Sequence, residues 1–182
     1  MGSTFSVTVS TGRLNELRQT HSVVKAAVES VDAKAADHTD VLLRNCRILL
    51  VEDGPDNQRL IAFILKKAGA EVTLAENGQI GFDLATAAKW EGCPFDVILM
   101  DMQMPVLDGY EATMQLRNDG YSHPIIELTA HAMASDRQKC LDAGCDDYAS
   151  KPVDRKKLVE ITASYAKQVN VAAVAVPASS GI

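Results

Sequence analysis

The sequence is organised around the stretch Val97-Ile98-Leu99-Met100-Asp101, four apolar residues that end on a carboxylate. An uninterrupted apolar run of this length predicts a β-strand buried on both faces, which is typical of a parallel sheet covered by helices. In open parallel sheets, ligands bind beyond the carboxyl ends of the strands. The stretch therefore predicts both a central strand and a chemically exposed acid at its end.

Further runs of the same kind lie on either side, separated by stretches with apolar residues at helical spacing. The expected strands are 48–51, 71–74, 97–100, 124–128 and 147–149, and the expected helices are 57–68, 77–90, 109–118, 134–143 and 154–167. Because parallel crossovers are right-handed, five strands alternating with five helices predict one α/β domain with a doubly wound five-stranded parallel sheet.

The composition narrows the range of partners. Apolar residues make up 47% of the chain and the formal net charge is −6. A chain this acidic lacks the basic surface of a nucleic-acid binder, and it has no basic cluster for anionic lipid. No apolar run is long enough to span a membrane. The four cysteines contain no C-x-x-C pair and are expected to be reduced, mostly buried thiols: Cys46, Cys93, Cys140 and Cys145.

The flanks differ from this regular part. Residues 5–9 alternate apolar and polar side chains like a strand without a partner. Residues 13–43 are interpreted as helix and linker, with a weak heptad spacing from Leu14 to Ala35. The second pattern fits a helix that pairs with another chain, but it fits a short amphipathic linker helix better. Residues 169–182 show no period, and we expect a disordered tail there.

Five polar side chains fall at the carboxyl ends of the predicted strands: Glu52, Asp53, Asp101, Thr129 and Lys151. Two unit charges about 4 Å apart repel by about 4 kcal/mol at a protein surface, so three neighbouring carboxylates need protons or a cation. A site of oxygen ligands with open positions favours magnesium, which keeps its waters and binds phosphate. Asp101 could then act as a nucleophile towards phosphorus, with Lys151 and Thr129 contacting phosphoryl oxygens.

Four sequence blocks carry a family resemblance: Val51-Glu52-Asp53, Met100-Asp101-Met102-Gln103-Met104-Pro105-Val106-Leu107-Asp108-Gly109, Leu128-Thr129-Ala130 and Ser150-Lys151-Pro152. In order and spacing they resemble the signature blocks of the response regulator receiver family over about 120 residues. The resemblance implies a flavodoxin-like fold with strand order 2-1-3-4-5. Asp108 lies directly before a predicted helix, and we interpret it as a helix cap rather than a site residue.

The same resemblance implies a role for each site residue. Asp101 would accept the phosphoryl group, and the cofactor would be Mg²⁺ or Mn²⁺. Asp53 and Asp101 would contact the metal directly, Glu52 would act through water, and the backbone carbonyl of Gln103 would be a further ligand. Thr129 and Tyr148 would form the switch pair that alters the surface of the fourth helix, fifth strand and fifth helix. The peptide bond between Lys151 and Pro152 would be cis.

The start of the chain carries a second, shorter resemblance. Residues 2–9 are similar to the last glycine turn and strand of a histidine-kinase ATP-binding domain. This implies a fragment of a hybrid sensor histidine kinase, divided into a kinase remnant at 1–11, a partly helical linker at 12–45, the receiver at 46–168 and a tail at 169–182. The implied location is cytoplasmic, which leaves open a membrane anchor elsewhere in the parent kinase.

The expected function is that of a phosphorelay receiver that takes a phosphoryl group from a phosphohistidine. Its partners would be a histidine-kinase phosphodonor domain and a histidine phosphotransfer protein, without nucleic acid or membrane contacts in this fragment. None of the histidines lies in a phosphodonor block, so whether the chain is itself an enzyme stays open. A receiver-like binding module that is not phosphorylated is the alternative. A magnesium-dependent phosphohydrolase is disfavoured, because Gln103 stands where a general-acid Asp is needed.

One residue departs from the family pattern. Glu127 lies in the fourth predicted strand, where a small or apolar side chain is usual. An unpaired buried carboxylate is costly, so we expect Glu127 to be partly exposed or paired with a donor such as His131.

Overall fold

The computed structural model describes residues 42–130 and 134–174, with side chains described for these except 134–137 and 170–174. The expectations for residues 1–41 and 175–182, and the pairing of Glu127 with His131, lie outside this part. The described elements alternate strictly along the chain: β1 (Arg47–Val51), α2 (Pro55–Lys67), β2 (Glu71–Ala75), α3 (Gly78–Trp90), β3 (Val97–Asp101), α4 (Gly109–Asn118), β4 (Ile125–Thr129), α5 (Ala134–Ala143), β5 (Asp147–Ser150) and α6 (Arg155–Val174).

The five strands form one parallel sheet in the order β2-β1-β3-β4-β5. This confirms the predicted fold class and strand order. The sheet order reverses between β1 and β3, so the loops after these two strands open in opposite directions. In the register, Val51 lies beside Met100, and Asp101 lies beside Leu128. The carboxyl ends of β1, β3 and β4 are therefore level with one another.

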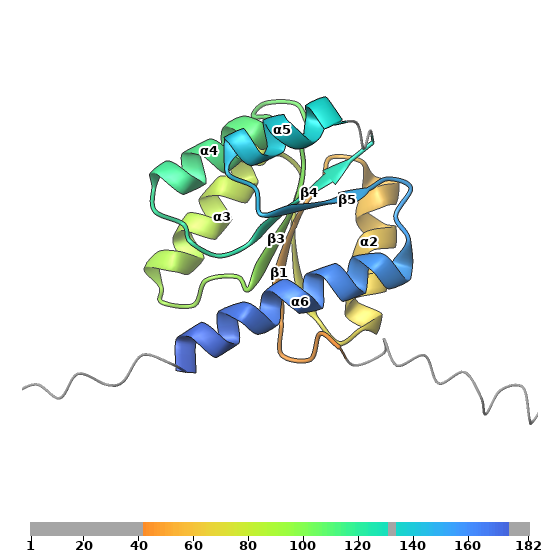
Figure 1. The fold of residues 1–182 in the computed structure, drawn as a ribbon, viewed down its shortest axis with the longest axis vertical. Coiled ribbons are helices and arrows are strands. Elements are labelled where there is room, and N and C mark those ends of the chain that lie inside the picture. Colours follow the sequence, from red (N-terminus) through yellow and green to blue (C-terminus); the bar gives the residue numbers. More distant parts are fainter. Residues whose placement is uncertain (1–41, 131–133, 175–182) are drawn as a thin grey trace, which may run out of the picture. The chain divides into compact units, whose positions relative to one another are not determined.

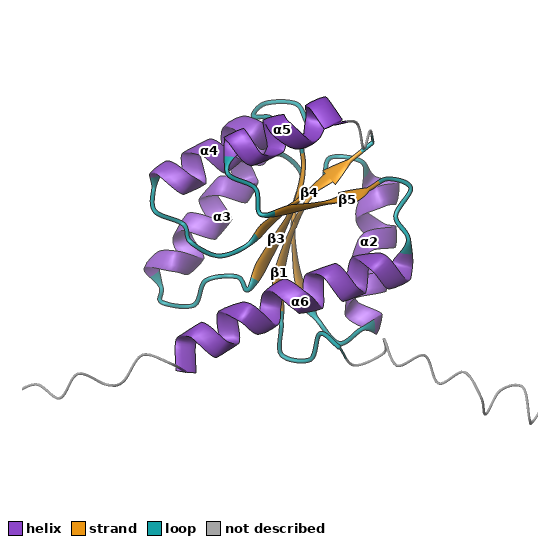
Figure 2. Ribbon diagram, in the orientation of Figure 1, coloured by secondary structure: helices purple, strands orange, loops and turns teal. Residues whose placement is uncertain are grey.

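Helices cover both faces of the sheet, with α2 and α6 on one side and α3, α4 and α5 on the other (Figure 1). Alternate residues of each strand point to opposite faces, so one strand supplies both cores. Ile48 and Leu50 pack with α2 and α6, whereas Leu49 and Val51 pack with α3 and α4. The strands stand edge-on between these helix layers (Figure 2). Burial on both faces explains why β1 and β3 contain continuous apolar runs and why the run in β4 is interrupted only by Glu127.

The two edge strands gave the weaker sequence signals for a physical reason. β2 and β5 each pair with a single neighbour, and most of their residues are exposed or half-buried. Edge strands tolerate polar side chains, so the sequences of β2 and β5 lack the long apolar run that marks a buried strand.

The last helix is longer than expected. α6 continues to Val174, so residues 169–174 are helical, although the sequence predicted a tail from residue 169. No helix-breaking residue occurs in that segment, and alanine favours helix; the next proline is Pro177. Among the described helices, none combines the length and apolar character needed to cross a bilayer.

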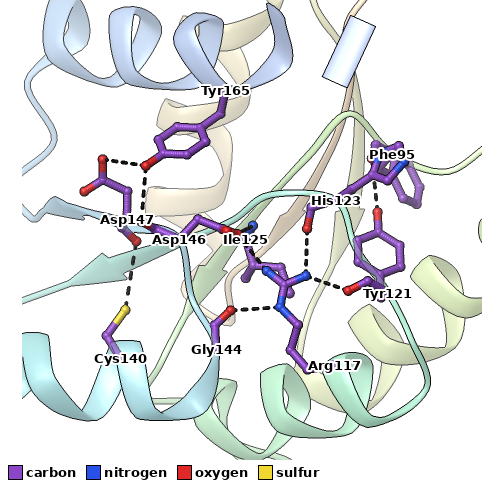
Figure 3. A network of polar contacts seen from close by, with 10 residues as sticks. All are labelled: Phe95, Arg117, Tyr121, His123, Ile125, Cys140, Gly144, Asp146, Asp147 and Tyr165. Atoms are coloured by element: carbon purple, nitrogen blue, oxygen red, sulfur yellow. Dashed lines mark hydrogen bonds and ion pairs between the residues drawn. The ribbon is translucent and has the colours of Figure 1, made fainter. Parts of the chain in front are cut away.

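A polar network joins several elements at the edge of the sheet opposite to the carboxyl ends (Figure 3). The Arg117 guanidinium of α4 donates to the carbonyl oxygens of Tyr121, His123 and Gly144 at 2.6–2.8 Å. It also pairs with Asp146 at 2.7 Å, and Asp146 accepts the Ile125 backbone N–H at 2.7 Å. This network fixes the C-terminal end of α5 against α4 and the first residue of β4, so any movement of α5 is restricted at that end.

Candidate functional site

Three carboxylates gather at the carboxyl edge of the sheet. Glu52 and Asp53 directly follow β1, and Asp101 is the last residue of β3. One oxygen from each of the three lies within 4.8 Å of the others. Glu52 and Asp101 are buried, whereas Asp53 is exposed. The structure thus brings together the three acids that the sequence placed at strand ends.

Lys151 connects two of these acids. Its Nζ lies 2.7 Å from Asp101 Oδ2 and 2.6 Å from Glu52 Oε2. Burial alone lowers the pKa of the Lys151 ammonium, but its hydrogen bonds and charge interactions with Asp101 and Glu52 outweigh burial and raise the pKa above its ordinary value. The backbone N–H of Lys151 donates to the Thr129 carbonyl at 2.6 Å, which fixes the loop after β5 beside the end of β4. The bond between Lys151 and Pro152 is cis.

The buried Glu52 is held by groups that the sequence did not single out. Its Oε1 accepts the Asn57 side-chain amide at 3.1 Å and the Gly54 backbone N–H at 3.3 Å. Gln58 donates to the Glu52 backbone carbonyl at 3.2 Å. Asn57 and Gln58 lie in the first turn of α2, five and six residues after Glu52. This short separation is the only sequence signal that could have indicated that their side-chain amides contact Glu52. Asp101 Oδ1 in turn accepts the Gln103 backbone N–H at 3.1 Å.

The loop between β3 and α4 depends on Gly109. A Cβ at this position would lie 2.1 Å from the Asp101 carbonyl oxygen, so α4 can start this close to β3 only from a glycine. The Gly109 N–H donates to the Met102 carbonyl at 3.1 Å. Asp108 Oδ1 accepts the Glu111 N–H at 2.8 Å, which confirms that Asp108 is a helix cap. These contacts hold the loop that follows Asp101.

A cavity of about 390 Å³ opens beside the acids. Its lining includes residues from six segments: Asn57, Asp101, Met102, Gln103, Tyr110, Leu128, Thr129, Ala130, Lys139 and Lys151. Thr129 and Gln103 therefore share a cavity with Asp101. Tyr148 is half-buried in β5 and lines a different cavity, between β5 and α6. Lys139 of α5 was not predicted as a site residue, because it follows no strand end.

Glu127 is almost completely buried, so the expectation of partial exposure was wrong. It lies on the α5 face of β4, in register with Tyr148 of β5. Neither carboxylate oxygen receives a regular hydrogen bond within the described residues. Its polar neighbour is Cys140 of α5: the pKa of this thiol is raised by a hydrogen bond with Cys145, by burial and by Glu127. The strand position imposed this burial, because β4 is covered on both faces.

The residues present fit a divalent metal ion. Three carboxylates carry three negative charges and Lys151 supplies one positive charge, so the cluster has two negative charges that no side chain in it balances. No donor within the described residues binds the exposed Asp53 carboxylate, so both of its oxygens are available. An all-oxygen donor set on two loops, open to solvent on one side, suits Mg²⁺ better than a soft transition metal.

Fold and site together define a doubly wound α/β domain with an acid cluster and a lysine at the carboxyl edge of its sheet. Residues 48–163 match the protein family described as the response regulator receiver domain. The chain belongs to this family, and it is a receiver domain of two-component signalling.

Several relatives are hybrid or sensor kinases. The chain is 43% identical over 119 residues to hybrid signal transduction histidine kinase I of Dictyostelium discoideum, a match that covers 63% of this chain and 7% of that protein. It is 40% identical over 157 residues to histidine kinase 1 of Arabidopsis thaliana, a match that covers 69% of this chain and 13% of that protein. The chain thus spans only a small part of these kinases. It covers 93% of the two-component response regulator ORR41 of Oryza sativa subsp. japonica, and 65% of this chain is matched there at 39% identity.

Solved structures agree with the fold. The receiver domain of the sensor histidine kinase PA1611 from Pseudomonas aeruginosa, solved with magnesium in its active site cleft, is 42% identical. Its TM-score is 0.61, and the match covers 67% of this chain and 98% of that one. A second similar structure is the receiver domain of Saccharomyces cerevisiae Ssk1, crystallised with the histidine phosphotransfer protein Ypd1. It is 30% identical with a TM-score of 0.62, and the match covers 70% of this chain and 92% of that one.

Proposed function

We propose that Asp101 accepts a phosphoryl group from a phosphohistidine on a partner protein, in a reaction that requires Mg²⁺. The observation that carries the proposal is the contact of the Lys151 ammonium with Asp101 Oδ2 at 2.7 Å, inside a cluster of three carboxylates. An Asp oxygen attacks phosphorus, the P–N bond breaks, and its electron pair stays on the imidazole nitrogen. Lys151 then pairs with a phosphoryl oxygen instead of the carboxylate.

The metal would be held by the side chains of Asp53 and Asp101, by Glu52 through water, and by the carbonyl of Gln103. When bound, Mg²⁺ supplies positive charge to phosphoryl oxygens that would otherwise be repelled by the acids. Manganese, which has the same preference for oxygen ligands, could take its place. Magnesium in the PA1611 receiver supports this assignment.

Thr129 and Tyr148 are proposed as the switch. Thr129 is in the cavity with Asp101, so its hydroxyl can turn towards a phosphoryl oxygen. Tyr148 of β5 pairs in register with Glu127, two residues before Thr129 on β4, and we infer that the Tyr148 ring turns inward when Thr129 moves. The surface of α5, β5 and α6 then changes, which is a population shift driven by a local charge.

A macromolecular donor is favoured by the surface beside the cavity. Asn57 lines the cavity, and Leu60 and Phe63 follow on the same helix with 52% and 65% exposure. Exposed apolar side chains next to a reactive group are typical of a protein-binding surface. We infer that a histidine phosphotransfer protein or a kinase phosphodonor domain contacts α2.

The chain would derive from a hybrid histidine kinase, with a kinase remnant at 1–11, a linker at 12–45, a receiver at 46–168 and a tail beyond.

Acetyl phosphate and MgCl₂ test the chemistry. The chain should gain the mass of one phosphoryl group, and Asp101→Asn should gain none. Asp56→Asn, which alters an exposed acid outside the cluster, should behave like the parent chain. If the parent chain gains no mass, or if the gain survives Asp101→Asn, the proposal is wrong and the chain acts as a receiver-like binding module without phosphorylation.

A second pair of variants tests the partner. Phe63→Ser should slow phosphoryl uptake from a phosphorylated histidine phosphotransfer protein but not from acetyl phosphate. Trp90→Ser is the matched control, because Trp90 is also exposed but lies at the end of α3, a helix on the other face of the sheet. Equal effects of the two variants with both donors would contradict docking on α2.

A further inference from the structure

A second lysine faces the cavity that holds Asp101. Lys139 lies in the second turn of α5 and lines this cavity together with Lys151 and Thr129. Helical side chains lean back towards the N-terminus of their helix, so Lys139 reaches towards the carboxyl end of β4 rather than away from it. Two cationic side chains thus border the position where a phosphoryl group on Asp101 would be.

The two lysines differ in what they already bind. Lys151 is engaged by Asp101 and Glu52. Within the described residues, Lys139 forms no ion pair, and its side chain is exposed. An ammonium that no described carboxylate pairs with, in the lining of a cavity that also contains Asp101, is available to an anion that enters there.

Charge balance indicates when Lys139 is needed. With a divalent cation bound, three carboxylates, Lys151 and the metal sum to zero. An acyl phosphate on Asp101 carries two negative charges in place of the one on the free carboxylate. The phosphorylated site with its metal therefore has a net charge of about −1. Lys139 carries the single positive charge that would cancel it.

We propose that Lys139 is a second phosphoryl-binding residue, which contacts the phosphoryl group on Asp101 and thereby fastens α5 to the modified site. The inference rests on the proposed phosphorylation of Asp101 and adds a direct link between the phosphoryl anion and α5. This link does not pass through Thr129 and Tyr148. Because the far end of α5 is held by Arg117, a contact at Lys139 would act on the N-terminal half of the helix.

Trifluoroberyllate, a tetrahedral anion that binds carboxylates as a phosphoryl analogue, tests the contact in the full chain. Its apparent Kd is measured at saturating Mg²⁺ by fluorine NMR, and the Kd for Mg²⁺ alone is measured by calorimetry. Lys139→Gln should weaken trifluoroberyllate about three- to tenfold, as expected for the loss of one partly exposed charge-assisted contact. The same variant should leave Mg²⁺ affinity unchanged or slightly tighter, because a nearby positive charge has been removed.

Two further variants separate charge from folding. Lys139→Arg should restore trifluoroberyllate affinity, and Lys66→Gln, on an exposed lysine at the end of α2, should have no effect. Equal trifluoroberyllate affinity in Lys139→Gln and the parent chain would overturn this inference alone, and so would a parallel loss of Mg²⁺ affinity. A parent chain that binds no trifluoroberyllate and takes no phosphoryl group from acetyl phosphate would overturn the proposed function and this inference together.

Discussion

Replacing Lys151 by methionine removes the ammonium while keeping a side chain of similar length, and its effect can be estimated from two contacts. Nζ lies 2.7 Å from Asp101 Oδ2 and 2.6 Å from Glu52 Oε2, and the Glu52 side chain is only 1% exposed. At an effective dielectric constant of about 20, each contact contributes about 6 kcal/mol before desolvation is counted. Desolvation offsets most of this, and breaking a buried ion pair typically costs about 3–5 kcal/mol.

The Lys151 side chain keeps 17% exposure, so we take the lower end of that range. Without divalent cations, Lys151→Met should lose about 3 kcal/mol of unfolding free energy, because two acids lose their shared cation. The vacated site should bind Mg²⁺ more tightly, and each tenfold gain in affinity narrows the stability difference at saturating Mg²⁺ by about 1.4 kcal/mol. The variant should therefore depend on Mg²⁺ for stability more than the parent chain does.

Urea unfolding followed by circular dichroism, in EDTA and again in saturating MgCl₂, measures both quantities. Lys66→Met is the control, since an exposed lysine should change stability by no more than about 0.5 kcal/mol. If Lys151→Met is as stable as Lys66→Met in EDTA, or if its affinity for Mg²⁺ falls, then Lys151 does not neutralise the acid cluster. In a phosphorylated sample, the same variant should show smaller shifts of the β5 signals by NMR than the parent chain, because Lys151 directly follows β5 and is proposed to pair with a phosphoryl oxygen.

The remaining predictions concern the metal, alkaline pH and the buried Glu127. Asp53→Asn should weaken Mg²⁺ binding by about tenfold or more while leaving metal-free stability unchanged, because no described donor contacts this carboxylate; an unchanged calorimetric Kd, or a loss equal to that of Asp56→Asn, would exclude Asp53 as a ligand. Burial, and then the charge of Asp96, raise the pKa of Cys46 from 9.0 to about 11, so its contribution to stability is complete below pH 9.0 and is lost as pH rises towards 11. Urea unfolding across this range should show a steeper fall for the parent chain than for Cys46→Ala, and parallel curves would contradict the assignment. Glu127→Met should raise the unfolding free energy by about 1–3 kcal/mol, because it removes a buried carboxylate without a regular partner; a loss of stability relative to the exposed-site control Glu111→Met would show that the carboxylate is satisfied in the fold.

Local pattern was sufficient for the sheet because burial on both faces leaves a direct trace in the sequence. The apolar runs around Leu50, Leu99 and Ile126 predicted strands covered on both faces, and the ends of these strands placed Glu52, Asp53, Asp101 and Thr129 at one edge. The helix from Gly109 to Asn118 and its Asp108 cap were equally local, since capping depends on a few neighbouring residues. The end of α6 could not be predicted from local pattern, because a sequence of alanine and valine is compatible with helix and with an irregular tail.

The sequence by itself determined which side chains end the strands of this receiver domain, since chain order and the parallel topology carry each strand end to the same edge. Only the tertiary structure decided how the site is completed. It placed the Lys151 ammonium between Asp101 and Glu52, added Asn57 from α2, and turned Lys139 of α5 towards the cavity. It also buried Glu127 beneath α5. These features depend on how helices pack over the sheet, and contacts between residues far apart in the chain leave no periodic signal in the sequence.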